Sequence, residues 1–184
     1  MTVKECVRLA AVNLGIAEEV NAFLNGENSQ SGQKKTELLL SCFNTVENEL
    51  ALDYLPLIAE DTVSSDTGVV QYGALENSVV RVIAVFDQWG EAVKFSLFPA
   101  YLKTQPGQVK IRYAYTPVKK DIDGVSDYET RVSARLVAYG MAEEYALTTG
   151  LFEEGAVWNR KYKEAIEAAY ATQPCARIRS RRWA

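Results

Sequence analysis

Hydrophobic residues in the first 56 positions recur every three or four residues, the spacing that places them on one face of a helix. The pattern predicts three helices, over about 3–14, 17–24 and 33–54. Thr2 and Glu5 fit a capping box in front of the first helix. Pro56 is expected to end the third helix, because the residue before a proline disfavours helical backbone angles.

From Leu57 onward the helical period is lost. The segment 58–68 is polar and acidic and contains serine and glycine residues that break regular structure, so it is not among the strand candidates. The strand candidates are rich in β-branched or alternating apolar residues and lie at 69–72, 79–86, 92–97, 101–102 and 109–115. Turns are predicted at 87–90 and 105–107, so neighbouring strands should pair antiparallel without crossover helices.

A fourth helix is predicted to begin at Ser126, which fits a capping box with Glu129, and to end at Gly150. It carries two apolar stripes, Val132, Leu136 and Tyr139 in one, and Val137, Met141 and Tyr145 in the other. Two stripes predict burial on more than one side, as in the centre of a bundle or at a contact between subunits. A fifth helix is expected over about 153–172.

Together these elements predict an α+β fold. The N-terminal and C-terminal helices are expected to bury their apolar faces against one another as a helical bundle, with a small antiparallel β domain inserted between them. The expected boundaries are 1–56 for the N-terminal part of the bundle, 57–117 for the β insertion, 118–173 for the C-terminal part of the bundle and 174–184 for an extended C-terminal arm.

Composition narrows the classes of function. The 184 residues, 48% hydrophobic and 24% charged, allow one domain with a sizeable insertion. The absence of histidine removes the commonest general base and the Ser–His and Cys–His pairs of nucleophilic enzymes. Three widely spaced cysteines, of which Cys6 and Cys42 are expected in the core, favour a reducing compartment. No signal-peptide pattern or membrane-spanning run is found, so the protein is expected to be made in a cytoplasm.

Motifs for chemistry are sparse. No phosphate-binding loop, dinucleotide fingerprint or nucleophile elbow occurs. The acidic stretch 121–124 is interpreted as a solvated turn, because the other ligands of a calcium loop are missing. Adjacent acids such as Glu143 and Glu144 do not face one another on a helix, so they are interpreted as solvated faces or as salt-bridge partners between subunits. No catalytic, cofactor-binding or metal-binding residue is predicted.

Two features are candidate contacts. Trp89 lies at the tip of a predicted hairpin, where simple packing and contact with a partner are equal alternatives. The last eight residues hold four arginines and no acid, in a chain whose net charge is −4. This segment is a disordered basic terminus, a peptide that orders on a partner with Trp183 in an apolar pocket, or a phosphate-binding tail.

A family resemblance rests on the order helices, β insertion, helices, on the short acidic loop after the last strand, and on three segments: VKIRYAYTP at 109–117, LVAYGMAEEYAL at 136–147 and WNRKYKEAI at 158–166. The pattern resembles the head–tail adaptor (connector) proteins of tailed bacteriophages, and most closely the tail tubular proteins of short-tailed phages. The resemblance implies a structural virion protein without enzymatic activity or cofactor. It implies a ring, commonly of twelve subunits, that is assembled in the host cytoplasm, docks beneath the portal and surrounds the channel through which genomic DNA leaves.

The resemblance also implies contact residues. In that family the C-terminal segment often reaches into the portal protein, and the matching positions here are Arg177, Ile178, Arg179, Arg181, Arg182 and Trp183. The β domain would face the next tail component, such as a nozzle, with Trp89 as a contact residue. One stripe of the fourth helix is expected to face a neighbouring subunit, through Val137, Met141 and Tyr145.

Two other hypotheses stay open. The alternative to the adaptor is a nucleic-acid-binding protein that uses the basic C-terminal tail, in which case its affinity for duplex DNA should fall steeply with salt. The third is an enzyme whose site is built from acids that folding brings together. In the adaptor hypothesis the DNA passes through the channel without specific binding, and no membrane is involved.

Overall fold

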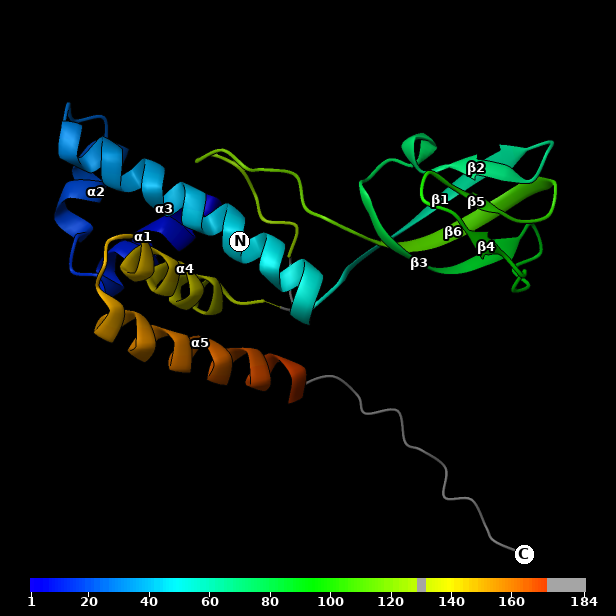
Figure 1. Cartoon of the computed structure of the whole chain (residues 1–184). Coiled ribbons are helices and arrows are strands. Elements are labelled where there is room, and N and C mark those ends of the chain that lie inside the picture. The colour runs from blue at the N-terminus through cyan, green and yellow to red at the C-terminus, as the bar shows by residue number, and fades with distance from the viewer. Residues whose placement is uncertain (129–131, 172–184) are drawn as a thin grey trace, which may run out of the picture. The chain divides into compact units, whose positions relative to one another are not determined.

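The computed structural model describes residues 1–128 and 132–171. The protein is a mixed helix and sheet structure with two small antiparallel sheets (Figure 1). The chain divides into two compact units. The helical unit contains residues 1–43 and the described residues from 132 onward, and the β unit is Asn44–Tyr128. The predicted C-terminal arm lies outside the described residues.

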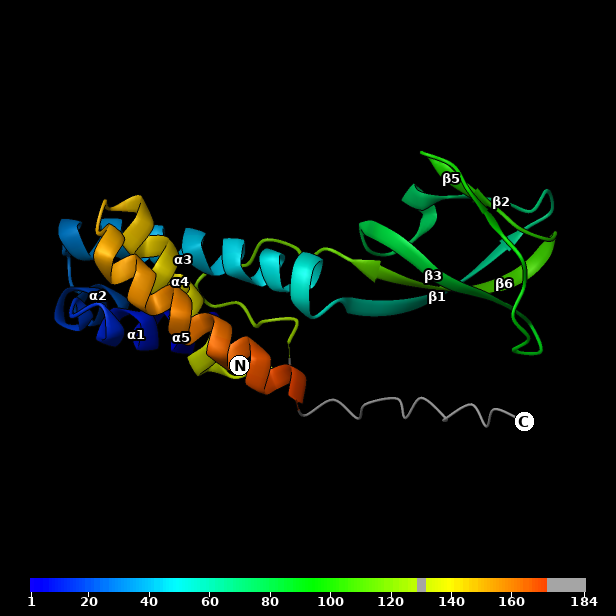
Figure 2. The same cartoon turned by 60° about the horizontal axis from the view of Figure 1, so that its bottom comes forward.

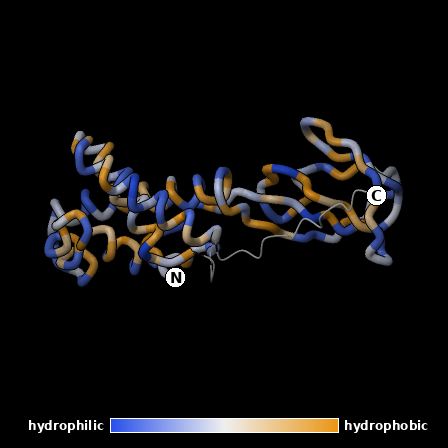
Figure 3. The backbone as a smooth tube through the Cα atoms, turned by 90° about the horizontal axis from the view of Figure 1, so that it is seen from below, coloured by the Kyte–Doolittle hydropathy of each residue, from blue (hydrophilic) through white to orange (hydrophobic). Residues whose placement is uncertain are grey.

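The helical unit is built from α1 (Val3–Asn13), α2 (Ala17–Leu24), the first part of α3 (Gln30–Glu49), α4 (Ala134–Thr148) and α5 (Phe152–Ala171). α4 contacts both α1 and α5, and α4 and α5 run side by side (Figures 1 and 2). Many of the apolar positions predicted for the helices are buried, among them Val3, Val7, Leu39, Phe43, Leu136 and Met141, whereas others, such as Leu14, Phe23 and Trp158, are only partly buried. Hydrophobic and hydrophilic residues alternate along the helices at short intervals (Figure 3).

The start of α1 follows its predicted cap. Thr2 Oγ1 accepts a hydrogen bond from the backbone N–H of Glu5 at 3.2 Å. α4, in contrast, begins at Ala134 and not at Ser126, so that prediction is wrong. Ser133 is the N-cap, and its Oγ accepts a hydrogen bond from the backbone N–H of Leu136 at 3.2 Å. Glu129, the other half of the predicted box, lies outside the described residues.

α3 ends in a wider helical turn. The π-helical residues Leu50–Tyr54 follow it directly, so the chain is helical up to Tyr54 as predicted. The backbone N–H of Leu55 donates to the carbonyl oxygen of Leu50 at 2.6 Å and closes this turn. Pro56 follows, and the first strand begins at Leu57. No described helix is long and apolar enough to cross a membrane.

The β unit holds two three-stranded antiparallel sheets. One has the order β1 (Leu57–Ser65), β6 (Gly107–Tyr115), β3 (Val79–Asp87), and the other has the order β2 (Val69–Gln71), β5 (Tyr101–Lys103), β4 (Ser96–Leu97). A short 3-10 turn, Tyr72–Ala74, follows β2. Side chains from both sheets form one core, with the buried members Val70, Leu75, Val85, Leu102, Val109, Ile111 and Tyr113.

Two strand predictions need correction. The polar segment 58–68 contains β1, because its side chains alternate and β6 pairs with all nine of its residues from Leu57 to Ser65. The predicted strand 92–97 is not continuous. Ala92 forms only an isolated bridge with Phe86, and β4 pairs with β5 in the other sheet. The predicted antiparallel direction is confirmed, but the prediction that neighbouring strands pair holds for β4 and β5 and is wrong for β3 and β6, which pair with each other.

The two outer strands of the first sheet differ. β3 pairs with β6 through two register shifts, which leave Val80 and Ile83 as extra residues. Such bulges twist a strand and disrupt its ladder. β1 pairs with β6 without any shift.

The end of α3 fixes the segment that returns from the sheets. Asn44 clamps the backbone of Lys120, with Nδ2 donating to the carbonyl oxygen at 3.1 Å and Oδ1 accepting from the N–H at 2.7 Å. Buried Glu47 accepts hydrogen bonds from Ser126 Oγ at 2.5 Å and from the backbone N–H of Asp127 at 3.0 Å. Ser126 is therefore used as a side-chain donor, not as a helix cap. Burial raises the pKa of the Glu47 carboxyl, and those two hydrogen bonds oppose the rise.

Candidate docking surface on the β unit

The outer face of the first sheet carries a cluster of charged and aromatic side chains. On β6, Val109, Ile111 and Tyr113 point into the core, so the residues between them point outward. Lys110 and Arg112 are these outward residues, and both are exposed. Glu60 of β1 is the cross-strand partner of Arg112, and Phe86 of β3 is the partner of Lys110. We call Glu60, Phe86, Lys110 and Arg112 the sheet cluster.

Both cations of the sheet cluster are paired with the same carboxylate, that of Glu60, so the cluster keeps one net positive charge. Lys110 Nζ lies 3.0 Å from Glu60 Oε2, and Arg112 Nε donates to Glu60 Oε1 at 2.6 Å. The hydrogen bonds from Lys110 and then from Arg112 hold the pKa of the Glu60 carboxyl below its usual value. The guanidinium carbon of Arg112 also lies 5.2 Å from the centre of the Phe86 ring. Glu60 and Arg112 lie directly opposite one another on neighbouring strands. Opposite charges in such positions attract, which favours the observed ion pairs.

The turn after β3 presents a large aromatic residue to solvent. Asp87 Oδ1 accepts hydrogen bonds from the backbone N–H groups of Trp89 and Glu91, both at 2.9 Å. Gly90 supplies the left-handed backbone angle that the turn requires, with φ of +85°. Trp89 is 78% exposed, so the turn is held in place while its indole stays open to solvent.

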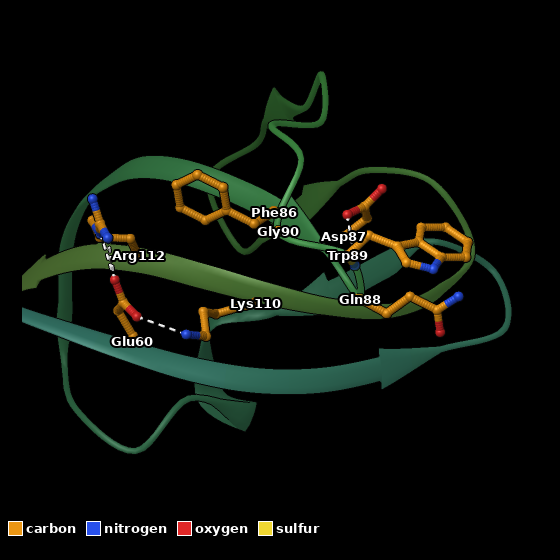
Figure 4. A pocket seen from close by; sticks show the side chains of 8 residues that line it. All are labelled: Glu60, Phe86, Asp87, Gln88, Trp89, Gly90, Lys110 and Arg112. Atoms are coloured by element: carbon orange, nitrogen blue, oxygen red, sulfur yellow. Dashed lines mark hydrogen bonds and ion pairs between the residues drawn. The ribbon is translucent and has the colours of Figure 1, made fainter.

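The sheet cluster and the turn enclose a shallow hollow of about 440 Å³, lined by Glu60, Phe86, Asp87, Gln88, Trp89, Gly90, Lys110 and Arg112. Figure 4 shows Trp89 and Gln88 at one end of it, and Glu60 with Arg112 at the other. An exposed indole beside aromatic and methylene surface is typical of a protein contact that is anchored by one large residue. The paired side chains of Glu60, Lys110 and Arg112 supply orientation and hydrogen bonds together with one net positive charge.

The acids and the cysteines of the described residues are two sets of side chains with potential metal-binding or nucleophilic chemistry. No group of three or more Cys, Asp or Glu residues in the described part of the chain is arranged to hold a metal ion. Cys6 and Cys42 are buried, as predicted. Burial, with the nearby Glu144 carboxylate adding to it, raises the pKa of the Cys42 thiol to about 12. That thiol is therefore not an activated nucleophile, because the reactive form is the thiolate.

The predicted site residues lie in three different places. Trp89 is exposed beside the hollow. Val137, Met141 and Tyr145 of α4 are buried in the single chain, with exposed fractions of 1%, 0% and 8%. From the sequence, the second stripe is expected to be buried either in the centre of a bundle or at a contact between subunits. Packing within the single chain is enough to explain its burial. The six portal-binding residues predicted between 177 and 183 lie outside the described residues.

The sequence did not single out the sheet cluster. Lys110 and Arg112 are two positions apart, which indicates that they share one face of a strand. Their partner Glu60, however, lies in a segment that was not predicted to be a strand. No protein-family model matches the chain, and no curated protein matches it either. We therefore infer function from the arrangement of the residues of this chain.

Proposed function

We propose that the protein is a structural head–tail adaptor of a tailed phage, which forms a ring beneath the portal, extends the DNA channel and anchors the tail. In this proposal the N-terminal and C-terminal helices form a bundle, the β unit is an insertion in it, and residues 174–184 are an extended arm. The observation that carries the proposal is the insertion: Asn44–Tyr128 is a compact unit of its own between two runs of helix. This is the element order on which the family resemblance rests.

The proposal assigns different partners to the two parts of the chain. The hollow with Trp89 contacts the next tail component, because the indole is exposed on a turn that its own hydrogen bonds hold in place. The basic arm, from Arg177 to Trp183, binds the portal. The side chains of Val137, Met141 and Tyr145 are not proposed as ring contacts, because the single chain already covers them.

The experiment is a mass measurement of the chain with and without the portal protein of the same phage. We expect the full chain to join the portal as a ring, even if the free chain is monomeric. Deletion of residues 177–184 should leave the unfolding midpoint unchanged and weaken portal attachment. Trp89→Ala is the matched variant, because it should leave portal attachment intact and weaken capture of the tail component by about tenfold or more, as for an aromatic anchor.

Two outcomes contradict the proposal. A full chain that never associates with the portal removes the adaptor function itself, and normal portal binding by the truncated chain removes the role of the arm. Tight binding to duplex DNA, lost both with the arm and at high salt, supports the nucleic-acid alternative instead.

A further inference from the structure

A second group of cations and aromatic rings lies on the helical unit. Arg135 and Tyr139 are four residues apart on α4, and Trp158 and Lys161 are three residues apart on α5, so each pair shares a helix face. The two helices run side by side (Figure 2), and the Tyr139 and Trp158 rings stack with centroids 5.8 Å apart. We call these four residues the helix cluster.

The aromatic rings hold both cations in place. Lys161 Nζ lies 4.1 Å from the centre of the Trp158 ring and 5.9 Å from that of the Tyr139 ring. Arg135 Nε donates a hydrogen bond to the Tyr139 hydroxyl oxygen at 2.6 Å. A guanidinium has five N–H donors, so this bond leaves the two terminal amino groups of Arg135 to meet another group. Cations fixed in this way lose less conformational entropy when a ligand binds.

Neither cation of the helix cluster is neutralised by a described residue. Lys35, Lys110, Arg112 and Lys120 form ion pairs within 4.0 Å, whereas no described carboxylate lies within that distance of Arg135 or Lys161. Arg135 is exposed, and Lys161 and both rings are partly exposed. The cluster therefore presents two positioned positive charges on an aromatic base, a combination suited to an anionic group.

Two acidic residues farther along α4 and α5 limit the kind of anionic partner that this surface can bind. Glu143 lies four residues after Tyr139 on α4, and Glu154 lies four residues before Trp158 on α5. By that spacing both acids lie on the helix faces of the cluster, toward the turn between the helices. Glu143 accepts a hydrogen bond from the Asn159 amide, and Glu154 is exposed. A long nucleic-acid backbone that runs along both helices is repelled by this acidic end, whereas a short acidic protein segment can end before it reaches Glu143 and Glu154.

We propose that the helix cluster is a binding site for an acidic segment of a partner protein, whose carboxylates meet Arg135 and Lys161. The site uses other residues than the proposed tail contact at Trp89 and the basic arm. It does not depend on the adaptor function, because it follows from the geometry of α4 and α5 and from two cations, Arg135 and Lys161, that no described carboxylate pairs with.

Trp158 provides a direct signal for the test. The chain has three tryptophans, and the double substitution Trp89→Phe and Trp183→Phe leaves Trp158 as the one fluorescent indole. In this background the full chain is titrated with a synthetic hexaglutamate peptide. We expect a change in Trp158 fluorescence that saturates and that weakens as salt is raised. The substitutions Arg135→Gln and Lys161→Gln together should lower the affinity about tenfold, because charge-assisted hydrogen bonds are lost.

Two control variants separate the site from general attraction and from misfolding. Arg160→Gln with Lys163→Gln removes two exposed cations from α5 and makes the same change in net charge, yet it should alter the affinity less than about twofold, as for charges that make no direct contact. Arg135→Lys with Lys161→Arg keeps both charges and should retain most of the binding. Unfolding midpoints of all variants should match that of the parent.

Three results overturn the proposal: no saturable binding by the parent, an equal loss in the control pair, or tighter binding of single-stranded or duplex DNA than of the peptide at the same site. Because none of these measurements uses the portal, they are independent of the outcome of the adaptor test.

Discussion

The sheet cluster and the helix cluster contain the same kinds of side chain in different electrostatic states. In the β unit, Arg112 lies over Phe86, and both Arg112 and Lys110 are paired with Glu60. In the helical unit, Lys161 lies over Trp158, and no described carboxylate pairs with it or with Arg135. In both clusters an aromatic ring lies under a cation. The clusters differ because the sheet cluster contains a carboxylate, that of Glu60, which pairs with its cations.

This difference separates two modes of recognition. Glu60 cancels one of the two positive charges of the sheet cluster, and an exposed ion pair adds little stability. Contact at the sheet cluster therefore depends on the indole of Trp89. At the helix cluster the unpaired cations are the attractive groups and the rings are their support. The first surface suits an apolar partner with a few matched polar groups, and the second suits an acidic one.

The largest expected effect comes from removing the aromatic base of each cluster. Trp158→Ala should lower the free energy of unfolding by about 2–3 kcal/mol, because the ring is partly buried, stacks on Tyr139 and supports Lys161. Phe86→Ala should cost about 1–2 kcal/mol, because Arg112 keeps its bond to Glu60. Urea unfolding of both variants measures the difference. A greater loss for Phe86→Ala contradicts the view that the paired cluster depends less on its ring.

A smaller effect is expected from removing the acid of the sheet cluster. Glu60→Gln leaves Lys110 and Arg112 without a carboxylate and should convert this surface into one that resembles the helix cluster. We expect hexaglutamate to bind the variant about threefold more tightly than the parent chain, with the gain lost at high salt. Glu76→Gln is the control, because Glu76 is also exposed on the β unit. An equal gain in the control shows that only net charge changed.

The smallest effect is a dependence of stability on pH. The folded-state pKa of Glu60 lies below its unfolded value of about 4.3, so its contribution is present above about pH 5 and is lost as pH falls toward the folded pKa. The gap in thermal midpoint between the parent and Glu60→Gln should therefore close below about pH 4. The thermal midpoint of Arg135→Gln with Lys161→Gln should stay level with that of the parent over that range, since no described carboxylate pairs with those cations. If the difference in thermal midpoint from the parent changes with pH in the same way for both variants, this prediction is wrong.

Much of the fold follows from local signals in the sequence. Thr2 caps the first helix as predicted, and the apolar period of α3 reaches Tyr54. The turn at 87–90 follows the strongest strand as predicted, and the exposure of Trp89 argues against simple packing, one of the two alternatives that the sequence left open. These features depend on residues a few positions apart, so periodicity, capping and turn chemistry are enough to find them.

The errors concern interactions between distant residues. β1 is polar on its outer face and carries Asp61 on its inner face, where Tyr113 Oη donates a hydrogen bond to Asp61 at 2.7 Å. Nothing local shows that partner, 52 positions away. Ser126 likewise looks like a helix cap until Glu47 is brought to it. Both clusters also require pairings between segments, namely the β1–β6 register and the packing of α4 on α5.

The unequal outer strands of the first sheet bear on how the protein behaves when it is concentrated. The bulges at Val80 and Ile83 make β3 a poor template for another strand. β1 has nine residues in regular register and, within the described chain, no strand on its far side. Heated or crowded chains should therefore begin to aggregate at β1, and a proline in place of Thr62, at the middle of that edge, is the substitution we expect to slow fibril formation most.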